Sequence, residues 1–293
     1  MAALPLLPRP LVWRFSQRYI AGTSLDDAYR VARQLNEAGC SATIDVLGED
    51  STSAAQVNEA VELYLAAIEG ISTRTLDCGI SVKLSELGLR FDASCARDAL
   101  RRLLRAASDN GLFVRIDMED SSVTDLTLDI YREAREDYDN VGIVIQSCLR
   151  RSAADVSALL RDGFTDVRLC KGIYIEPAAI AYTSADDIRQ SFRNLLVQLL
   201  ESGNSRVGIA THDPLLVEHA RQSLQALAVP KTAYEFQMLL GVAGPLRWQL
   251  VDAGHPLRVY VPFGERWYAY SMRRLRENPN IAGHIVKNLF KPR

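Results

Sequence analysis

Short apolar runs bounded by glycine, proline, asparagine and other turn residues recur along the whole chain. Eight of these runs have the length expected of a strand: residues 42–47, 80–84, 112–118, 141–147, 167–170, 207–211, 233–239 and 257–262. Many are almost continuously apolar, as in Val-Gly-Ile-Val-Ile at 141–145. That pattern is typical of strands in a parallel sheet that is covered on both faces.

Segments with helical periodicity lie between successive strand candidates. They cover residues 53–70, 94–110, 123–138, 153–161, 185–203, 214–228 and 242–253. Eight strand and helix repeats in one domain predict an α/β fold, a distorted (β/α)8 barrel of the TIM type. An open doubly wound sheet is the alternative, but no G-x-G-x-x-G follows the first strand candidate, so a dinucleotide-binding half is unsupported.

Two segments fall outside these repeats. Residues 13–39 contain a helical stretch for which Ser24 or Thr23 is the expected N-cap. After the last strand, residues 265–277 and 281–290 both have helical character and are separated by Asn278-Pro279, whereas a barrel needs only one closing helix there. We therefore expect an N-terminal arm and helix over residues 1–40, packed on one catalytic barrel at 41–293. Helix 265–277 would lie over the barrel mouth, and 281–290 would form a terminal helix.

Composition and charge narrow the function classes. The 293 residues carry 36 acidic and 34 basic side chains, and a formal net charge of −2 removes the field that drives non-specific nucleic-acid binding. No apolar run approaches the roughly 20 residues of a membrane span, and Pro5, Pro8 and Pro10 make the N-terminus a poor secretory signal. We expect a cytoplasmic protein. The five cysteines show no C-x-x-C spacing, so we expect no disulfide framework and mostly small buried side chains.

Polar residues gather at the predicted carboxyl ends of the strands, where barrels of this class place their active sites. They are Lys83, Asp117, Gln146, Arg168, Lys171, Tyr174, Thr211, His212, Gln237 and Tyr260. Cations outnumber anions in this set, which suits phosphates and a small molecule that carries a carboxylate. His212 has no second histidine or cysteine at ligand spacing, and Asp213 reads as the N-cap of the next helix, so we expect no metal site.

Each of these features also has a purely structural interpretation. Arg168 can pair with Asp117 while Lys171 faces solvent, and Lys83 with Asp117 can form an ion pair at the barrel rim. In helix 265–277, one face holds Tyr270, Arg273, Arg274 and Glu277, which is either a clamp for a substrate carboxylate or a solvated amphipathic face. The sequence contains no G-x-S-x-G elbow or P-loop, so hydrolase and NTPase functions lack their motifs.

Several of these segments occur together in one known family. They are Val82-Lys-Leu-Ser85 with Leu87-Gly88, Ile116-Asp-Met-Glu-Asp120, Val144-Ile-Gln146, Arg168-Leu-Cys-Lys-Gly-Ile-Tyr174, Ala210-Thr-His212, Glu235-Phe-Gln-Met-Leu239, Val259-Tyr-Val-Pro-Phe-Gly264 and Tyr270-Ser-Met-Arg-Arg-Leu-Arg-Glu277. In this order they resemble the proline dehydrogenases, especially their monofunctional bacterial form. The resemblance spans nearly the whole chain and implies FAD held at the strand ends below a pocket closed by the extra helix.

The resemblance also implies roles for individual residues. Arg273 and Arg274 would hold the proline carboxylate together with Lys83, and Glu277 would steady the two arginines. The pyrrolidine ring would lie against Tyr174, Leu239 and Tyr270. Tyr260 would orient the clamp, and Asp117 would position Lys83 and the substrate amine. The positions that correspond to FAD contacts are Met118, Gln146, Arg168, Lys171, Gly172, Ile173, Thr211, His212 and Gln237.

The implied reaction is hydride transfer from C5 of L-proline to flavin N5, which gives Δ1-pyrroline-5-carboxylate and is the first step of proline catabolism. Arg168 would stabilise negative charge on the reduced flavin. Electrons would pass to a membrane quinone through peripheral contact with the inner face of the cytoplasmic membrane. Ile173, Cys170 and Leu240 depart from the family pattern. A flavin barrel for hydroxyproline or pipecolate, a non-enzymatic binding barrel, and assembly as a homo-oligomer stay open.

Overall fold

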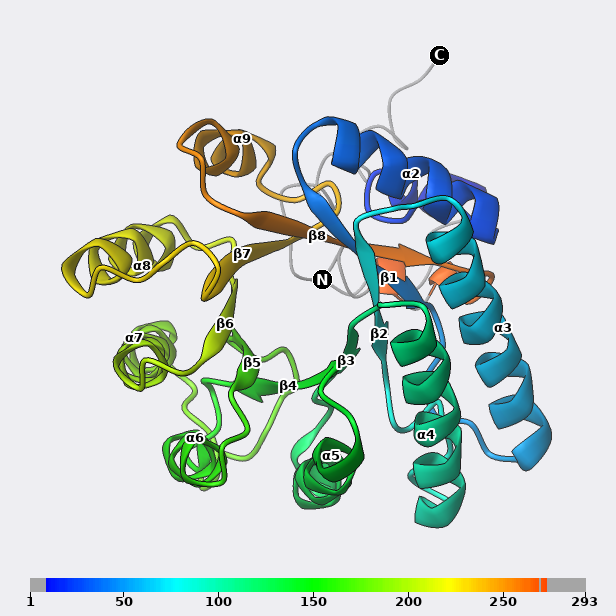
Figure 1. Cartoon of the computed structure of the whole chain (residues 1–293), viewed down its shortest axis with the longest axis horizontal. Coiled ribbons are helices and arrows are strands. Elements are labelled where there is room, and N and C mark those ends of the chain that lie inside the picture. Colours follow the sequence, from blue (N-terminus) through cyan, green and yellow to red (C-terminus); the bar gives the residue numbers. More distant parts are fainter. Residues whose placement is uncertain (1–8, 269, 273–293) are drawn as a thin grey trace, which may run out of the picture.

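The computed structural model describes residues 9–268 and 270–272 and contains a closed barrel of eight parallel strands (Figure 1). The strands are β1 Ser41–Val46, β2 Cys78–Val82, β3 Val114–Ile116, β4 Val141–Gln146, β5 Asp166–Cys170, β6 Arg206–Ala210, β7 Tyr234–Leu239 and β8 Leu257–Phe263. Strands β8 and β1 pair from Ser41 with Arg258 to Val46 with Phe263, which closes the sheet. The predicted barrel is confirmed, and the open sheet is wrong.

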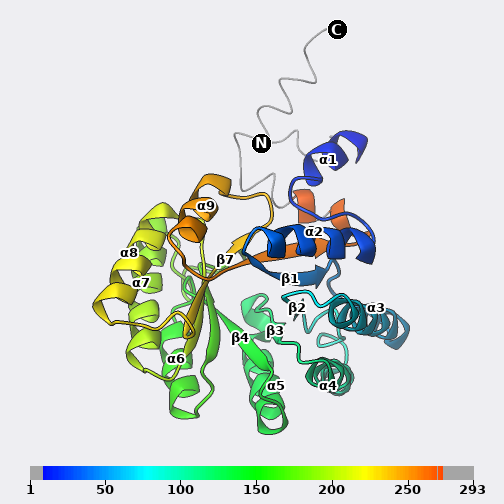
Figure 2. The same cartoon turned by 45° about the horizontal axis from the view of Figure 1, so that its top comes forward.

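Helices surround the barrel, as Figures 1 and 2 show. They are α3 Ala54–Thr73, α4 Ala93–Asp109, α5 Thr124–Asp137, α6 Ser152–Arg161, α7 Ala185–Glu201, α8 Pro214–Ala226 and α9 Gly244–Asp252, and every helix predicted between two strands is present. Strand β3 starts later than predicted because the Leu112 amide donates back to the Ala107 carbonyl at the end of α4, and it ends at Ile116 instead of Met118. Within the described residues, no helix has the length and apolar character needed to cross a membrane.

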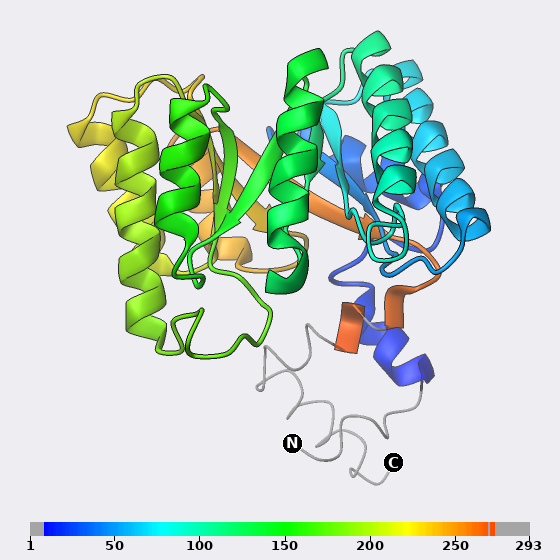
Figure 3. The same cartoon turned by 90° about the horizontal axis from the view of Figure 1, so that it is seen from below.

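Two helices precede the barrel. Helix α2, Leu25–Glu37, begins at Ser24 as predicted, where Ser24 and Asp27 form a capping box. Helix α1, Arg9–Ser16, was not predicted: the expected N-terminal helix was the one that Ser24 or Thr23 caps, and Pro10 lies in the first turn of α1. Proline is tolerated in the first turn of a helix, since its missing N–H would have had no partner there. Figure 3 shows α1 beside the helical residues that follow β8, and the Trp13 and Trp267 rings contact each other with centroids 4.7 Å apart.

Side chains alternate between the two faces of each strand. One face packs against the surrounding helices, and the other points into the barrel interior. Outward-facing residues such as Ile80 and Phe236 belong to one apolar layer between the strands and the helices. The barrel interior is polar instead: Ser81, Arg168 and Gln237 are buried there, and Arg168 donates hydrogen bonds to the other two. All five cysteines are free, as expected, and Cys40, Cys78 and Cys148 are buried. A polar interior open at one end can place charged groups beside a ligand.

Candidate active site

A cavity of about 750 Å³ opens at the carboxyl ends of the strands. Every predicted site residue that the structure describes lines it: Lys83, Asp117, Met118, Gln146, Arg168, Lys171, Gly172, Ile173, Tyr174, Thr211, His212, Gln237, Leu239, Tyr260 and Tyr270. Arg273, Arg274 and Glu277 lie outside the described residues. Tyr270 belongs to the segment predicted to close the mouth, so the described part of that segment does reach the cavity.

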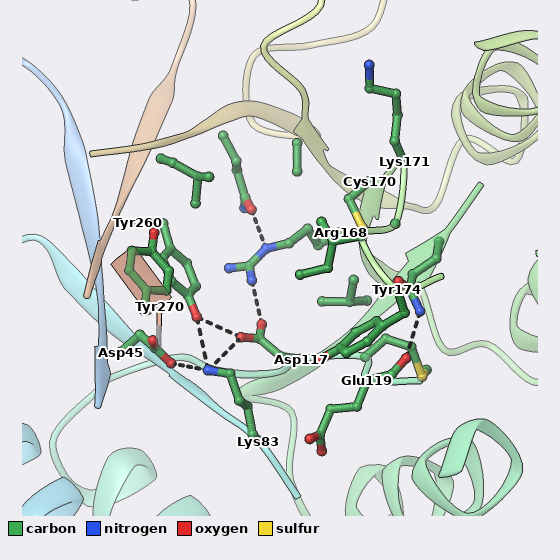
Figure 4. A pocket seen from close by; sticks show the side chains of 18 of the residues that line it. Asp45, Lys83, Asp117, Glu119, Arg168, Cys170, Lys171, Tyr174, Tyr260 and Tyr270 are labelled. Atoms are coloured by element: carbon green, nitrogen blue, oxygen red, sulfur yellow. Dashed lines mark hydrogen bonds and ion pairs between the residues drawn. The ribbon is translucent and has the colours of Figure 1, made fainter. Parts of the chain in front are cut away.

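Asp117 is the centre of a hydrogen-bonded network in the cavity floor (Figure 4). Its Oδ1 accepts hydrogen bonds from Arg168 Nη1 at 2.7 Å and Ser81 Oγ at 2.8 Å. Its Oδ2 accepts one from the Tyr260 hydroxyl at 2.8 Å. Burial lowers the pKa of Arg168, while the Asp117 carboxylate opposes that shift. The Arg168–Asp117 ion pair considered as a structural alternative is therefore present, and it forms part of the cavity itself.

Lys83 reaches the same network from β2, but its nearest anion is Asp45. Lys83 Nζ lies 2.6 Å from Asp45 Oδ1 and 3.8 Å from Asp117 Oδ2. Burial opposes the charge on Lys83, yet the Asp45 and Asp117 carboxylates raise its pKa well above the ordinary value, so it is a cation. Burial raises the pKa of Asp45 to about 6. Sequence reasoning missed Asp45, although a carboxylate within the apolar strand β1 was a signal that it faces a polar interior.

The rim of the cavity carries Lys171, which is paired rather than free in solvent. Lys171 Nζ lies 3.1 Å from Asp213 Oδ2, and Arg189 Nε lies 2.7 Å from the same oxygen. Asp213 also accepts a hydrogen bond from the Leu215 amide and so caps α8, as predicted. Arg189 also pairs with Asp186, so the cluster as a whole is balanced in charge. The partly exposed Lys171 is its member that lines the cavity and can meet an anionic ligand group.

His212 is fixed by the backbone. Its Nε2 accepts a hydrogen bond from the Leu239 amide at 2.8 Å, which places the proton of the neutral ring on Nδ1. Within residues 9–268 and 270–272, no group of three or more histidine, cysteine, aspartate or glutamate side chains is arranged to hold a metal ion. His212 therefore ties the ends of β6 and β7 together beside the cavity.

The expected excess of cations is absent from the described lining. That lining contains the carboxylates of Asp45, Glu49, Asp117 and Glu119 and the basic groups of Lys83, Arg168, Lys171 and Arg266. Four of these charged residues were not among the predicted site residues: Asp45 within β1, Glu49 after β1, Glu119 after β3 and Arg266 after β8. This part of the lining therefore has an equal number of opposite charges, which suits a zwitterionic ligand, while Arg273, Arg274 and Glu277 lie outside the described residues.

Behind the cavity, Glu86 is buried and accepts a hydrogen bond from the Tyr64 hydroxyl at 3.2 Å. Burial raises the pKa of Glu86 from 4.5 to about 8, although Lys83 opposes the shift. The folded protein therefore keeps this proton in a pH range where the unfolded chain has lost it. Stability from Glu86 is full below pH 4.5 and is lost as the pH rises toward 8.

Glu86→Gln is expected to flatten the pH dependence of the free energy of unfolding between pH 4.5 and 8, because it removes this proton uptake. The wild-type protein should lose up to about 1.4 kcal/mol more per pH unit than the variant in that window. Urea denaturation at several pH values measures the difference, with the exposed Glu62→Gln as a control. Equal slopes for the wild-type protein and Glu86→Gln would contradict the assignment.

The chain has clear relatives among known proteins. It matches the family model described as Proline dehydrogenase over residues 28–285. It is 36% identical over 276 residues to Proline dehydrogenase 1 of Bacillus subtilis subsp. natto, which covers 94% of this chain and 91% of that protein. It is 35% identical over 290 residues to the Proline dehydrogenase of Deinococcus radiodurans, with 97% and 93% of the two chains covered.

Solved structures show the same barrel. Proline utilization A (PutA) from Bdellovibrio bacteriovorus, inactivated by N-propargylglycine, superposes with a TM-score of 0.83 at 28% identity over 90% of this chain. The present chain spans only 32% of that longer chain. The family match, the two bacterial relatives and the shared barrel all agree, and the chain belongs to the proline dehydrogenase family of oxidoreductases.

Proposed function

We propose that this protein oxidises L-proline to Δ1-pyrroline-5-carboxylate, the first step of proline catabolism, with FAD as its cofactor. The observation that carries the proposal is the network around Asp117, in which the buried Arg168, the partly buried Lys83 and the Tyr260 hydroxyl converge on one carboxylate. Together with Asp45 it gives a fixed polar surface of balanced charge on one side of the cavity. The names of the two bacterial relatives support the same activity.

The residues of the cavity fit a large flat anionic cofactor. Gly172 has φ +93°, and a Cβ on it would lie 2.4 Å from Cys148 Sγ, so only glycine lets the backbone form this wall. FAD would be held by Met118, Gln146, Arg168, Lys171, Gly172, Ile173, Thr211, His212 and Gln237, all of which line the cavity. When bound, FAD supplies the acceptor for the hydride that leaves C5 of proline. Lys171 would meet its phosphates, and Arg168 would favour negative charge on its reduced ring.

The substrate would be held by charged and aromatic residues of this chain. Lys83, Arg273 and Arg274 would bind the proline carboxylate, with Glu277 steadying the arginines. Tyr174, Leu239 and Tyr270 would enclose the apolar ring and keep water away from it. Asp117 would position the amine, and Tyr260 keeps the Asp117 carboxylate in place through its hydrogen bond. Positioning of this kind is the main contribution that a protein makes to a cofactor reaction.

We also propose that electrons leave the reduced enzyme to a quinone, through peripheral contact between a cytoplasmic protein and the inner face of the cytoplasmic membrane. The support for this step is the resemblance to the proline dehydrogenases alone. A comparison of a quinone in lipid vesicles with a water-soluble acceptor tests it. Turnover only with the water-soluble acceptor would contradict it.

Product analysis tests the proposed function. The purified protein is expected to carry FAD and, with L-proline and an artificial electron acceptor, to release a cyclic imine that an aromatic amino-aldehyde traps as a coloured adduct. Hydroxyproline and pipecolate serve as competing substrates and should react more slowly than proline. A preparation that neither retains nor takes up FAD would contradict the proposal, as would preferred oxidation of another cyclic amine.

A further inference from the structure

Arg168 donates hydrogen bonds to two groups of residues. One contains Asp117 and Ser81, and the other contains Gln237 on β7. On β7, Glu235 and Gln237 are two residues apart and therefore face the barrel interior together. Gln237 Oε1 accepts a hydrogen bond from Arg168 Nε at 2.5 Å, and Gln237 Nε2 donates one to Glu235 Oε1 at 2.6 Å. All three side chains are buried. The amide of Gln237 thus connects a guanidinium to a carboxylate.

Only one orientation of this amide satisfies both neighbours. If the amide turned over, its NH2 group would face the N–H groups of Arg168, and its oxygen would face the carboxylate of Glu235. Each of those contacts places like partial charges together without water to screen them. Glu235 therefore determines which way Gln237 points, and Gln237 in turn gives Arg168 Nε its acceptor.

Glu235 has the charge that this role needs. Its Oε1 lies 2.8 Å from Arg258 Nε, and its Oε2 lies 3.3 Å from Arg206 Nη2. Burial would raise the pKa of Glu235, but Arg258 and Arg206 outweigh burial and lower it. The carboxylate therefore stays ionised and fixed at the inner end of the Gln237 amide.

Gly208 on β6 makes room for the connection. It pairs with Arg168 on one side and with Glu235 on the other, so Gln237 must pass its backbone to reach β5. A Cβ at Gly208 would lie 2.6 Å from Gln237 Nε2 and 2.8 Å from Gln237 Cδ. Any larger residue would push the amide away, because the end of a glutamine side chain moves more easily than the strand.

We propose that Glu235 is a positioning residue for Arg168 and acts through the amide of Gln237. The proposal rests on the proposed function, in which Arg168 faces the flavin. Glu235 and Gly208 contact neither the proposed substrate nor the proposed cofactor. They hold the Arg168 guanidinium in the orientation in which it would stabilise negative charge on the reduced flavin.

Two variants disturb the Gln237 amide in different ways. Glu235→Gln removes the carboxylate that accepts a hydrogen bond from the amide. Gly208→Ala displaces the amide by steric contact and changes no charge. Both are expected to move the flavin midpoint potential to more negative values and to lower kcat for proline by about tenfold, with KM changed by less than about threefold. If Glu235 acted only through its negative charge, Glu235→Gln would move the flavin midpoint potential to more positive values. Gly208→Ala would then leave the potential unchanged.

Asp166→Asn is the matched control. Asp166 is another carboxylate paired with Arg115 and Arg206, and it shares Arg206 with Glu235. It makes no hydrogen bond to Gln237, so Asp166→Asn removes a nearby negative charge and leaves the hydrogen bonds of the Gln237 amide in place. The Asp166→Asn variant should lower the free energy of unfolding and leave the flavin midpoint potential unchanged. Glu235→Gln removes the carboxylate partner of Arg258 and one of the two carboxylate partners of Arg206. If this loss prevents Glu235→Gln from folding, Gly208→Ala alone tests the proposal.

Flavin binding and reduction of the wild-type protein by proline distinguish a failure of the proposed function from a failure of the positioning role. If the wild-type protein binds no flavin or is not reduced by proline, the proposed function fails. If it is reduced normally and Gly208→Ala keeps the wild-type potential, the positioning role is overturned. A crystal structure of flavin-free Gly208→Ala adds a readout without flavin: Arg168 Nε is expected to lie beyond hydrogen-bond distance of Gln237 Oε1, and an intact bond would also overturn the proposal.

Discussion

Asp117→Asn is expected to lower kcat for L-proline by about 100- to 1,000-fold, the range seen when one preorganised group is lost from an active site. Asp117 accepts hydrogen bonds from Arg168, Ser81 and Tyr260, so an amide would present its NH2 group to at least one donor. The variant also leaves the charge of Arg168 without its anion. Removing one member of such a buried pair destabilises folding by about 3–5 kcal/mol.

Steady-state kinetics and urea denaturation of the same preparations separate the two effects. Asp166→Asn is again a close match, because Asp166 is a partly buried, arginine-paired carboxylate outside the cavity lining. It should lose stability and retain kcat. Retention of wild-type kcat by Asp117→Asn would contradict the placement of this carboxylate at the centre of the site.

Lys83→Met is expected to raise KM for L-proline by about 100-fold, because one charge-assisted bond to the substrate carboxylate contributes up to about 3 kcal/mol. Methionine keeps the length of the side chain and removes its charge. It also leaves Asp45 buried without the cation 2.6 Å away, so the pKa of Asp45 should rise further and the carboxyl should become neutral.

The kinetic split identifies the role of Lys83. A rise in KM with a smaller fall in kcat indicates loss of substrate binding. Asp45→Asn should weaken proline binding in the same direction, because Lys83 then loses its nearest anion. The exposed Lys231→Met, which is outside the cavity lining, is the control and should match the wild-type protein. An unchanged KM in Lys83→Met would contradict the proposed carboxylate contact.

The arrangement of strands and helices could be predicted from the sequence because its signals are local. Apolar runs, helical periodicity and caps such as Ser24 are each contained within a few residues. The strand ends could also be predicted, since parallel strands bring their carboxyl ends to one face of the barrel. Together with the family motifs, this explains why each predicted site residue that the structure describes lies in the cavity.

The missed residues depend on distances that only the closed barrel creates. Asp45 lies on β1, and its partner Lys83 comes from the end of β2, 38 positions later. Glu235 was seen only as part of a family motif, since its link to Arg168 passes through Gln237 and over Gly208. Arg266 follows β8 and lines the cavity. Such contacts join separate strands, and no short pattern in the sequence encodes them.

Anaerobic absorption spectroscopy of the FAD-bound protein tests the central claim most directly. Addition of L-proline is expected to bleach the visible flavin band, because the substrate's hydride reduces the ring while oxygen is absent. Asp117→Asn with bound FAD should bleach far more slowly, and D-proline should leave the wild-type band intact. A wild-type flavin that stays oxidised in excess L-proline would contradict the account.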